Sequence, residues 1–343
     1  MKRKSGILWF VLLLSLSSCV SYENFSIEVF KPAKYTIPPD IHKVAIVSRN
    51  LKYENDTLQN YQVINRHLVK DKIKFDVDSL AIKTCLDSLE AKLLVNSRFD
   101  SILVLPVNSF PEARVKEIRP DKAGWYQKLT GETGADGLLL LDMFSSFYSN
   151  LEGYNSGPLV SVISSNIWSF YDGKQQKITN RYVLIDTLYW DGTDVDGHIK
   201  RLRIPGKKAA IQLAAGISGQ KYARHIVPAW TMVDRKLMTC KKPEFEKAAS
   251  LAQKTKWEEA SVIWQKYAES KNRQDQIIAL YNLALSSEMA GNIDLALDYT
   301  GRAAKASSGA FWTDENDAVK KYSAKLYRRQ IEINQLKNTN ESR

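Results

Sequence analysis

Hydrophobic positions in the first part of the chain alternate between strand-like and helix-like patterns. Ile41–Val47 and Phe99–Leu105 are compact apolar runs that predict strands, and Leu138–Leu141 is a continuous apolar run typical of a strand buried on both faces. Apolar residues recur at helical spacing after Asp78, which predicts a helix with Asp78 as its N-cap. A second helix is expected over residues 122–130.

The pattern then changes to a hairpin and a further helix. Residues 160–171 and 178–190 are strand-like, and Asp172-Gly173-Lys174 between them predicts a tight turn. A helix is expected over residues 208–226, followed by a short strand-like segment. This order of elements predicts an α/β fold class, a mixed sheet with flanking helices, over residues 41–237.

The pattern is helical throughout the last part of the chain. Small residues recur where helices must cross closely, and Ala260 and Ala296 occupy equivalent places 36 positions apart. This spacing resembles a tetratricopeptide repeat, whose period is about 34 residues. We therefore expect an all-α, tetratricopeptide-like domain over residues 238–336, capped by a last helix. The polar residues 337–343 are expected to form a disordered tail.

The N-terminal segment has the pattern of an export signal. Basic residues at positions 2–4 precede a short apolar core, and Leu16-Ser17-Ser18-Cys19 closes it with small residues and a cysteine. These four residues resemble a bacterial lipobox, in which the signal is cleaved before a cysteine that becomes lipidated. The sequence therefore predicts a signal peptide over residues 1–18 and a lipid anchor in a membrane at Cys19. Residues 19–40 are expected to form a tether that contains the first strand.

The charge of the chain is basic, with a formal net value of +11. Without the three basic residues of the predicted signal, 46 Lys and Arg stand against 38 Asp and Glu, a net charge of +8. This balance favours anionic surfaces such as lipid headgroups or acidic glycans. Nucleic acid is not an expected partner, because an exported lipoprotein does not normally meet it. The densest basic patch comprises Lys200, Arg201, Arg203, Lys207 and Lys208, for which a solvated loop and helix start is the alternative interpretation.

Motifs for catalysis, metal binding or cofactor binding are incomplete. The four histidines do not occur at metal-ligand spacing. Gly216-Ile217-Ser218-Gly219 lacks one residue of a nucleophile elbow and lies inside a predicted helix, where small residues favour close packing. The strongest metal candidate is the acidic turn with Asp191, Asp194 and Asp196, but it lacks the glutamate of a calcium loop, and an ordinary turn is the favoured interpretation. We therefore expect no cofactor, no metal and no enzyme activity.

Cys85 and Cys240 are the two cysteines that remain after Cys19. An exported protein allows them to form a disulfide. Cys85 lies on an apolar helical stripe, however, where a free thiol packs as a small hydrophobic group. The sequence leaves both possibilities open.

Aromatic side chains near and within the helical region are candidates for binding a protein partner. Arrays of helical repeats present a groove to partners, and exposed tryptophans are frequent anchors of interfaces. For Trp230, which follows a predicted break at Pro228, packing at the seam between two domains is the alternative. The predicted partner-binding residues are Trp257, Trp264, Tyr267, Tyr281 and Trp230.

Several segments together are similar to a known family. The lipobox, the segments KPAKYTIPPDIHKVAIVSRN, ADGLLLLD and YARHIVPAW, and the repeat-like end resemble an uncharacterised family of Bacteroidota lipoproteins. The resemblance implies lipidation and no catalytic residue, because that family has no assigned activity. More loosely, the first domain looks like the periplasmic domains of curli-secretion and penicillin-binding-protein-activator lipoproteins, which is an analogy of fold alone.

These observations predict a lipid-anchored envelope protein that acts as a non-enzymatic scaffold. The α/β domain is expected near the membrane, with the helical repeats presenting a groove to a protein partner in the envelope. One alternative is a module that binds envelope glycan or anionic lipid through the basic patch, and a second is a hydrolase with an unfamiliar site. The resemblance implies a location on the outer membrane facing the periplasm, because the residues after Cys19 contain one acid only and so lack an acidic surface-export stretch.

Overall fold

The structure of the chain is a computed structural model that describes residues 20–55, 61–70, 76–120, 123–151, 158–192, 204–308 and 314–341. The contacts of the chain divide it into two compact units. The sheet unit contains residues 33–229, and the helical unit contains the described residues up to Pro32 together with those from Trp230 onward. The predicted fold class, a mixed sheet with flanking helices followed by packed helices, is confirmed.

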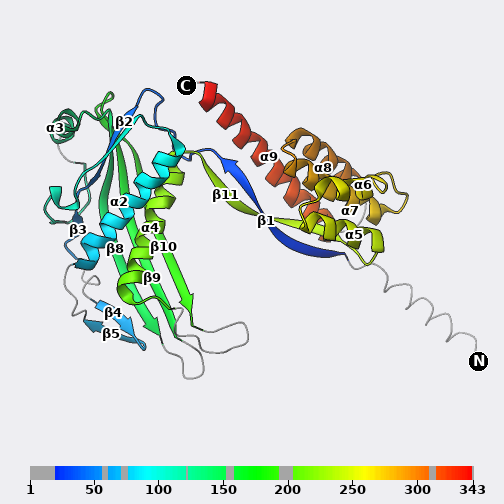
Figure 1. Ribbon diagram of the computed structural model, residues 1–343, viewed down its shortest axis with the longest axis horizontal. Helices are drawn as coiled ribbons and strands as arrows, with labels where there is room; N and C mark the ends of the chain where they lie inside the picture. The colour runs from blue at the N-terminus through cyan, green and yellow to red at the C-terminus, as the bar shows by residue number, and fades with distance from the viewer. Residues whose placement is uncertain are drawn as a thin grey trace, which may run out of the picture. The chain divides into compact units, whose positions relative to one another are not determined.

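The sheet unit is built on a mixed sheet with seven strands in the described residues (Figure 1). The main order is β10-β9-β8-β2-β6, and the β4–β5 hairpin pairs with the end of β8. β2 is parallel to β6 and β8, whereas β8, β9 and β10 run antiparallel. β3 and β7 form a separate parallel pair. The bounds are β2 Lys43–Ser48, β3 Leu51–Tyr53, β4 Tyr61–Ile64, β5 His67–Lys70, β6 Ser101–Val104, β7 Ala113–Val115, β8 Gly137–Leu151, β9 Leu159–Asp172 and β10 Lys177–Asp191.

The apolar run Leu138–Leu141 lies in β8 at the centre of this sheet, as its pattern predicts. These leucines are at most 1% exposed, because helices cover both faces of the sheet here. Alternate leucines pack beneath α2 (Asp76–Asn96) and α4 (Lys207–Ile226) on one face, and beneath α3 (Ala123–Thr133) on the other. The core of the unit is therefore two apolar layers separated by the sheet.

Glycines allow α4 to pack closely against α2. A Cβ atom at Gly219 would lie 2.1 Å from the carbonyl oxygen of Cys85 and 3.1 Å from the amide nitrogen of Leu89, so only glycine fits there. Ser218 is fully buried, and its hydroxyl donates to the carbonyl oxygen of Ala214. The Gly216–Gly219 segment is thus a packing surface between two helices, as the sequence predicts.

The helical unit contains five packed helices within the described residues (Figure 1). Each contacts the next along the chain, and α9 also contacts α7. Ala260 and Ala296, the predicted equivalent positions, are both fully buried. The side chains of Asn272 and Asn292 accept backbone N–H bonds at the starts of α7 and α8. The bounds are α5 Pro243–Gln253, α6 Trp257–Gln265, α7 Arg273–Met289, α8 Ile293–Ser307 and α9 Asp314–Glu341.

The last helix is longer than the sequence pattern indicates. α9 continues to Glu341, so most of the segment 337–343, predicted as a disordered tail, is helical. The segment contains no proline or glycine, and nothing in it therefore forces the helix to end at residue 336.

A two-stranded ribbon completes the helical unit. It pairs β1 (Ser21–Lys31) with β11 (Ala229–Thr239). The rings of Phe30 and Trp230 lie 5.3 Å apart, and Ser26 Oγ donates to Asp234 Oδ1 at 2.8 Å. Residue numbers therefore fall along one strand as they rise along the other, which makes the strands antiparallel. β1 supplies the strand predicted within residues 19–40, and its partner strand begins almost 200 positions after it ends.

Buried polar groups attach this ribbon to α7. The side-chain amide of Asn282 accepts a hydrogen bond from the amide of Met238 at 3.1 Å and donates one to its carbonyl oxygen at 2.7 Å. Arg235 makes two hydrogen bonds to the carboxylate of Glu288, at 2.5 and 2.8 Å, and Tyr322 Oη donates to the same carboxylate at 2.8 Å. Burial lowers the pKa of Arg235, but the Glu288 carboxylate raises it by more, so the guanidinium stays charged.

We expect the substitution Gly219→Ala to destabilise the sheet unit by about 2–3 kcal/mol, because the new methyl group overlaps backbone atoms of α2. The control is Gly131→Ala in α3, where nothing lies within 4 Å of the added Cβ. This change is expected to leave stability unchanged or raise it by up to about 1 kcal/mol. Urea unfolding followed by circular dichroism measures both. Equal stability of the two variants would contradict the close crossing of α2 and α4.

Replacing Arg235 by Met is expected to cost about 3–5 kcal/mol, because Glu288 then remains buried without its cation. The double variant Arg235→Met/Glu288→Leu is expected to recover most of that loss. The matched control is Lys256→Met, which removes one partner of the exposed Lys256–Glu259 pair and is expected to cost less than about 1 kcal/mol. Urea unfolding again gives the free energies of unfolding. A double variant that is no more stable than Arg235→Met alone would count against a buried ion pair.

Candidate functional site

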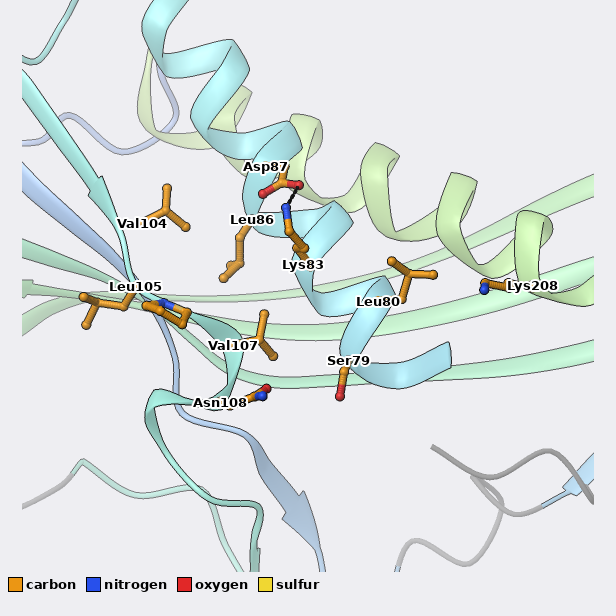
Figure 2. A pocket seen from close by; sticks show the side chains of 11 residues that line it. Ser79, Leu80, Lys83, Leu86, Asp87, Val104, Leu105, Val107, Asn108 and Lys208 are labelled. Carbon is orange, nitrogen blue, oxygen red and sulfur yellow. Dashed lines mark hydrogen bonds and ion pairs between the residues drawn. The ribbon is translucent and has the colours of Figure 1, made fainter. Parts of the chain in front are cut away.

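A cavity in the sheet unit lies at the carboxyl end of β6, beside α2. The chain leaves β2 towards α2 on one face of the sheet and leaves β6 towards α3 on the other face. A crevice between two adjacent strands whose connections diverge in this way is the usual ligand position in α/β sheets. The cavity, called here the strand-end cavity, has a volume of about 750 Å³. Its lining residues are Ser79, Leu80, Lys83, Leu86, Asp87, Val104, Leu105, Pro106, Val107, Asn108 and Lys208 (Figure 2).

The lining of the strand-end cavity is mainly apolar, with charges at its edge. Leucine and valine side chains come from α2 and from the segment that follows β6. Lys83 Nζ and Asp87 Oδ2 form an ion pair of 2.6 Å along α2 (Figure 2). Lys208 enters from the first turn of α4 and, within the described part of the chain, makes no ion pair. The net charge of the lining is therefore set by Lys208.

A smaller cavity of about 240 Å³ adjoins the first and shares Ser79, Val107 and Asn108 with it. Lys52 lies here between two carboxylates, with its Nζ 3.0 Å from Asp78 Oδ2 and 3.1 Å from Glu112 Oε2. Burial lowers the pKa of Lys52, and the two carboxylates raise it by more, so the lysine is cationic. All three groups are engaged in ion pairs with one another, which favours a structural role for them.

Asn50 shapes this region, because it holds the segment after β6 in place. Its backbone is in the left-handed region, with φ of 52°. From there its amide donates to the carbonyl oxygens of Val107 and Phe110, both at 2.7 Å. Asparagine tolerates such a backbone better than most residues. The wall of the strand-end cavity thus depends on one side chain at the end of β2.

A second cavity, called here the ribbon cavity, lies inside the helical unit and has a volume of about 520 Å³. It opens between the β1–β11 ribbon, the turn from α5 to α6 and the end of α7. The ring of Trp257 packs 5.5 Å from that of Phe25, and Met232 and Met289 add flexible apolar surface. The lining residues are Glu23, Asn24, Phe25, Ser26, Ile27, Glu28, Met232, Leu237, Ala252, Gln253, Thr255, Trp257 and Met289.

The structure separates the predicted partner-binding residues into two groups. Trp257 lines the ribbon cavity, Trp230 is 62% exposed on the ribbon, and Tyr267 is half-buried beside Phe245. Trp264 and Tyr281 are 1% and 3% exposed, so their prediction as binding residues is wrong. Both side chains fill the space between helices, where a partner has no access to them.

The predicted basic patch lies only partly within the described residues. Lys200, Arg201 and Arg203 fall outside them. Lys207 is half-buried in the first turn of α4, with its Nζ 5.8 Å from the centre of the Tyr148 ring, and burial lowers its pKa. Lys208 is exposed and lines the strand-end cavity. Of the two described residues of the patch, Lys208 therefore meets a cavity and Lys207 packs on an aromatic ring.

The described residues include only some of the predicted metal, cysteine and lipidation residues. Asp191 is exposed at the end of β10, whereas Asp194, Asp196 and Cys19 lie outside the described residues. Among the described side chains, no three of His, Cys, Asp or Glu are grouped to hold a metal ion. Cys85 and Cys240 are both free thiols, and burial raises the pKa of each.

No helix in the described part of the chain has the length and apolar character to cross a membrane.

His225 is the histidine most enclosed by other side chains in the described residues. Its ring stacks 3.9 Å from that of Tyr182, and its Nε2 lies 3.3 Å from Asn180 Oδ1. Burial lowers the pKa of His225, and nearby Lys34 lowers it further. The imidazole is therefore neutral at pH 7 and packs among aromatic rings, which is a structural role.

Apart from Lys208, sequence reasoning missed the residues that line the strand-end cavity and the smaller cavity beside it. The segment after β2, with Asn50 and Lys52, and the segment after β6, with Val107 and Asn108, carry no recognisable motif. The available signal was positional, because residues that follow two adjacent parallel strands meet at one edge of a sheet. That signal requires the strand order, which the sequence pattern does not provide.

Comparisons with known proteins add family relationships. No curated protein matches the chain. A solved DUF330-family protein from Xanthomonas campestris shares 13% identity over 56% of this chain and 90% of its own length, with a TM-score of 0.28. A minor lipoprotein from Acinetobacter baumannii shares 10% identity over 56% of this chain and 98% of its own, with a TM-score of 0.24. Likeness at these scores is distant, and we base no inference on it.

Two family models match the chain itself. Residues 246–332 match the model described as Domain of unknown function (DUF6340), which covers most of the helices of the helical unit. Residues 41–237 match the model described as Domain of unknown function (DUF8603), which covers the sheet unit and most of β11. Because this second match spans more than half of the 343 residues, the chain belongs to the DUF8603 family.

Proposed function

We propose that this protein is a lipid-anchored, non-enzymatic scaffold of the bacterial cell envelope that holds a protein partner at its ribbon cavity. The observation that carries the proposal is an open cavity beside Trp257, in the part of the molecule that follows Cys19 most closely in the chain. The resemblance of the sequence to Bacteroidota lipoproteins agrees with it. The tetratricopeptide-like spacing of the helices supports the same type of function.

The position of β1 supports a membrane-side place for the helical unit. β1 begins at Ser21, two positions after Cys19, and it is an integral strand of the helical unit. An acyl anchor on Cys19 leaves a spacer of about 7 Å between lipid and strand. The proposal therefore ties the helical unit directly to the anchor.

The helical unit offers a partner its ribbon cavity rather than the face of α7. β11 lies against α7 through Asn282 and Arg235, so this chain's own strand occupies that face. The ribbon cavity remains open, with Trp257 inside it and Met232 57% exposed at its edge. Tryptophan anchors and flexible methionines are features of protein-binding surfaces. A partner that reaches this cavity must itself be at or near the membrane.

The lining residues support binding rather than catalysis. The described side chains that line these cavities include no histidine and no cysteine. Two of the lining lysines are engaged in ion pairs, Lys83 with Asp87 and Lys52 with Asp78. A general acid or base needs a free group aimed at a substrate. An outer-membrane location facing the periplasm remains the proposed address, because Glu23 is the one acid in the residues directly after Cys19.

A second candidate function, binding of an anionic ligand through basic residues, is favoured by one specific observation. Lys208, part of the predicted basic patch, is directed at the strand-end cavity without an acidic partner in the described residues (Figure 2). The two functions use different units of the protein and are compatible in one molecule.

We expect Cys19→Ser to move the protein from the membrane fraction to the soluble envelope fraction, because the acyl chains are the proposed anchor. Fractionation of cells followed by immunoblotting measures the change. The matched control is Cys240→Ser, which alters a half-buried free thiol and is expected to leave the protein in the membrane fraction. Retention of the Cys19→Ser protein with the membrane would overturn the proposed anchor.

We expect a photo-reactive amino acid at position 232 to capture a discrete envelope protein, because Met232 is exposed at the ribbon cavity. The control position is Val262, which is 62% exposed on α6 and does not line the cavity. Adding Trp257→Ala is expected to reduce capture from position 232 by more than tenfold, since anchor residues contribute about 2 kcal/mol or more. Mass spectrometry identifies the captured protein.

Three outcomes of this experiment decide against the proposed scaffold. Equal capture from positions 232 and 262 would indicate non-specific contact. Capture from position 232 that persists with Trp257→Ala would place the interface outside the ribbon cavity. Absence of capture from position 232 in native envelopes would contradict the binding of a protein partner at the ribbon cavity. Circular dichroism of the Trp257→Ala protein shows whether the helical unit stays folded.

A further inference from the structure

We propose that the strand-end cavity is a binding site for a single-chain anionic amphiphile, a straight-chain carboxylate whose head group contacts Lys208. This site lies in the sheet unit and is separate from the ribbon cavity of the proposed scaffold function. The inference combines the volume of the cavity, the apolar character of its walls and the charge at one end.

The walls of the cavity suit a hydrocarbon chain. Leu80 and Leu86 of α2 face Val104, Leu105 and Val107 across the cavity (Figure 2). Its volume of about 750 Å³ lies within the usual range for small-molecule sites, which is roughly 300–1,000 Å³. Apolar surface of this extent is costly to leave in water, and a hydrocarbon chain would remove it from water.

The charge distribution selects the head group. Lys83 is matched by Asp87 at 2.6 Å, so these two side chains contribute no net charge to the lining. Lys208 adds one positive charge at the α4 side, next to Leu80 in the view of Figure 2. The hydroxyl of Ser79 and the amide of Asn108 are the remaining polar groups of the lining. One lysine without an ion-pair partner among the described residues, beside an apolar cavity, complements a ligand with one negative charge at the end of an apolar chain.

The position of Lys208 strengthens this charge argument. It lies with Lys207 in the first turn of α4, which contains no acidic residue and has no side-chain cap. Cations are unfavourable at the N-terminus of a helix, because the helix dipole is positive there. An anionic head group beside Lys208 would relieve this repulsion.

The test is titration calorimetry with octanoate, decanoate and dodecanoate on the full chain carrying Cys19→Ser, which avoids detergent. We expect saturable binding that tightens by up to about 15-fold with each added pair of methylene groups, since one buried methylene contributes about fourfold. Decanol, which has the same chain length as decanoate without the charge, is expected to bind more weakly. A rising salt concentration is expected to weaken the binding of decanoate but not the binding of decanol.

Variants assign the site within the molecule. Lys208→Met is expected to lower the affinity for decanoate about tenfold and to leave the affinity for decanol unchanged, because it removes a charge-assisted contact with the head group. The control Lys92→Met changes an exposed lysine of α2 outside the cavity lining and is expected to leave both affinities unchanged. Leu80→Trp fills the cavity and is expected to abolish binding of both ligands. Unfolding curves of each variant show whether it is folded.

The proposal is overturned by affinity that does not depend on chain length, or by the absence of saturable binding to the folded protein. Equal loss of decanoate and decanol binding in Lys208→Met would remove the head-group assignment. Binding unaffected by Leu80→Trp would place the ligand elsewhere. Because position 232 belongs to the helical unit, capture of a protein partner there is independent of these results.

Discussion

The pairing of β1 with β11 is the constraint on which the rest of this architecture depends. The sheet unit is inserted between these two strands, since the chain leaves the ribbon after Lys31 and returns to it at Ala229. A contact of such long sequence separation closes a long loop, whose entropic cost grows only slowly with length but whose formation is slow. Folding of the intervening sheet unit brings the two strand sequences together and shortens the effective loop. The helical unit therefore depends on both ends of the inserted unit emerging close to each other.

Buried polar groups define how the ribbon is attached. Asn282 binds both backbone polar groups of Met238, and Glu288 binds Arg235 and Tyr322. Buried ion pairs add little net stability, because both charges lose water, but an unpaired member is costly. A slip of β11 by one residue would turn Arg235 to the opposite face and leave Glu288 without its cation. The polar contacts thus act mainly by excluding other registers, while the apolar core of the helical unit provides most of the stabilisation.

The two cavities arise from different features of the fold and carry different chemistry. The strand-end cavity follows from the topology of a parallel sheet, where the connections after β2 and β6 diverge. The ribbon cavity follows from the docking of a straight ribbon against the ends of helices, where Trp257 and Phe25 leave space beside them. The first is apolar with one unmatched lysine, and the second is apolar with methionine and tryptophan. These compositions suit a small amphiphile and a protein partner respectively.

The sequence by itself determined the elements of this protein and the main features of its cores. Continuous leucines predicted the central strand, and the small residues of α4 predicted a close helix crossing, because local pattern reflects local burial. Tertiary structure alone decided which aromatic residues are accessible: Trp257 and Trp264 lie on the same helix, yet one lines a cavity and the other is buried. It also decided that β11 joins the helical unit, and that Leu80, Val107 and Lys208 line one cavity. Those outcomes depend on contacts between residues far apart in the chain, and no local pattern of hydrophobic and polar positions records such contacts.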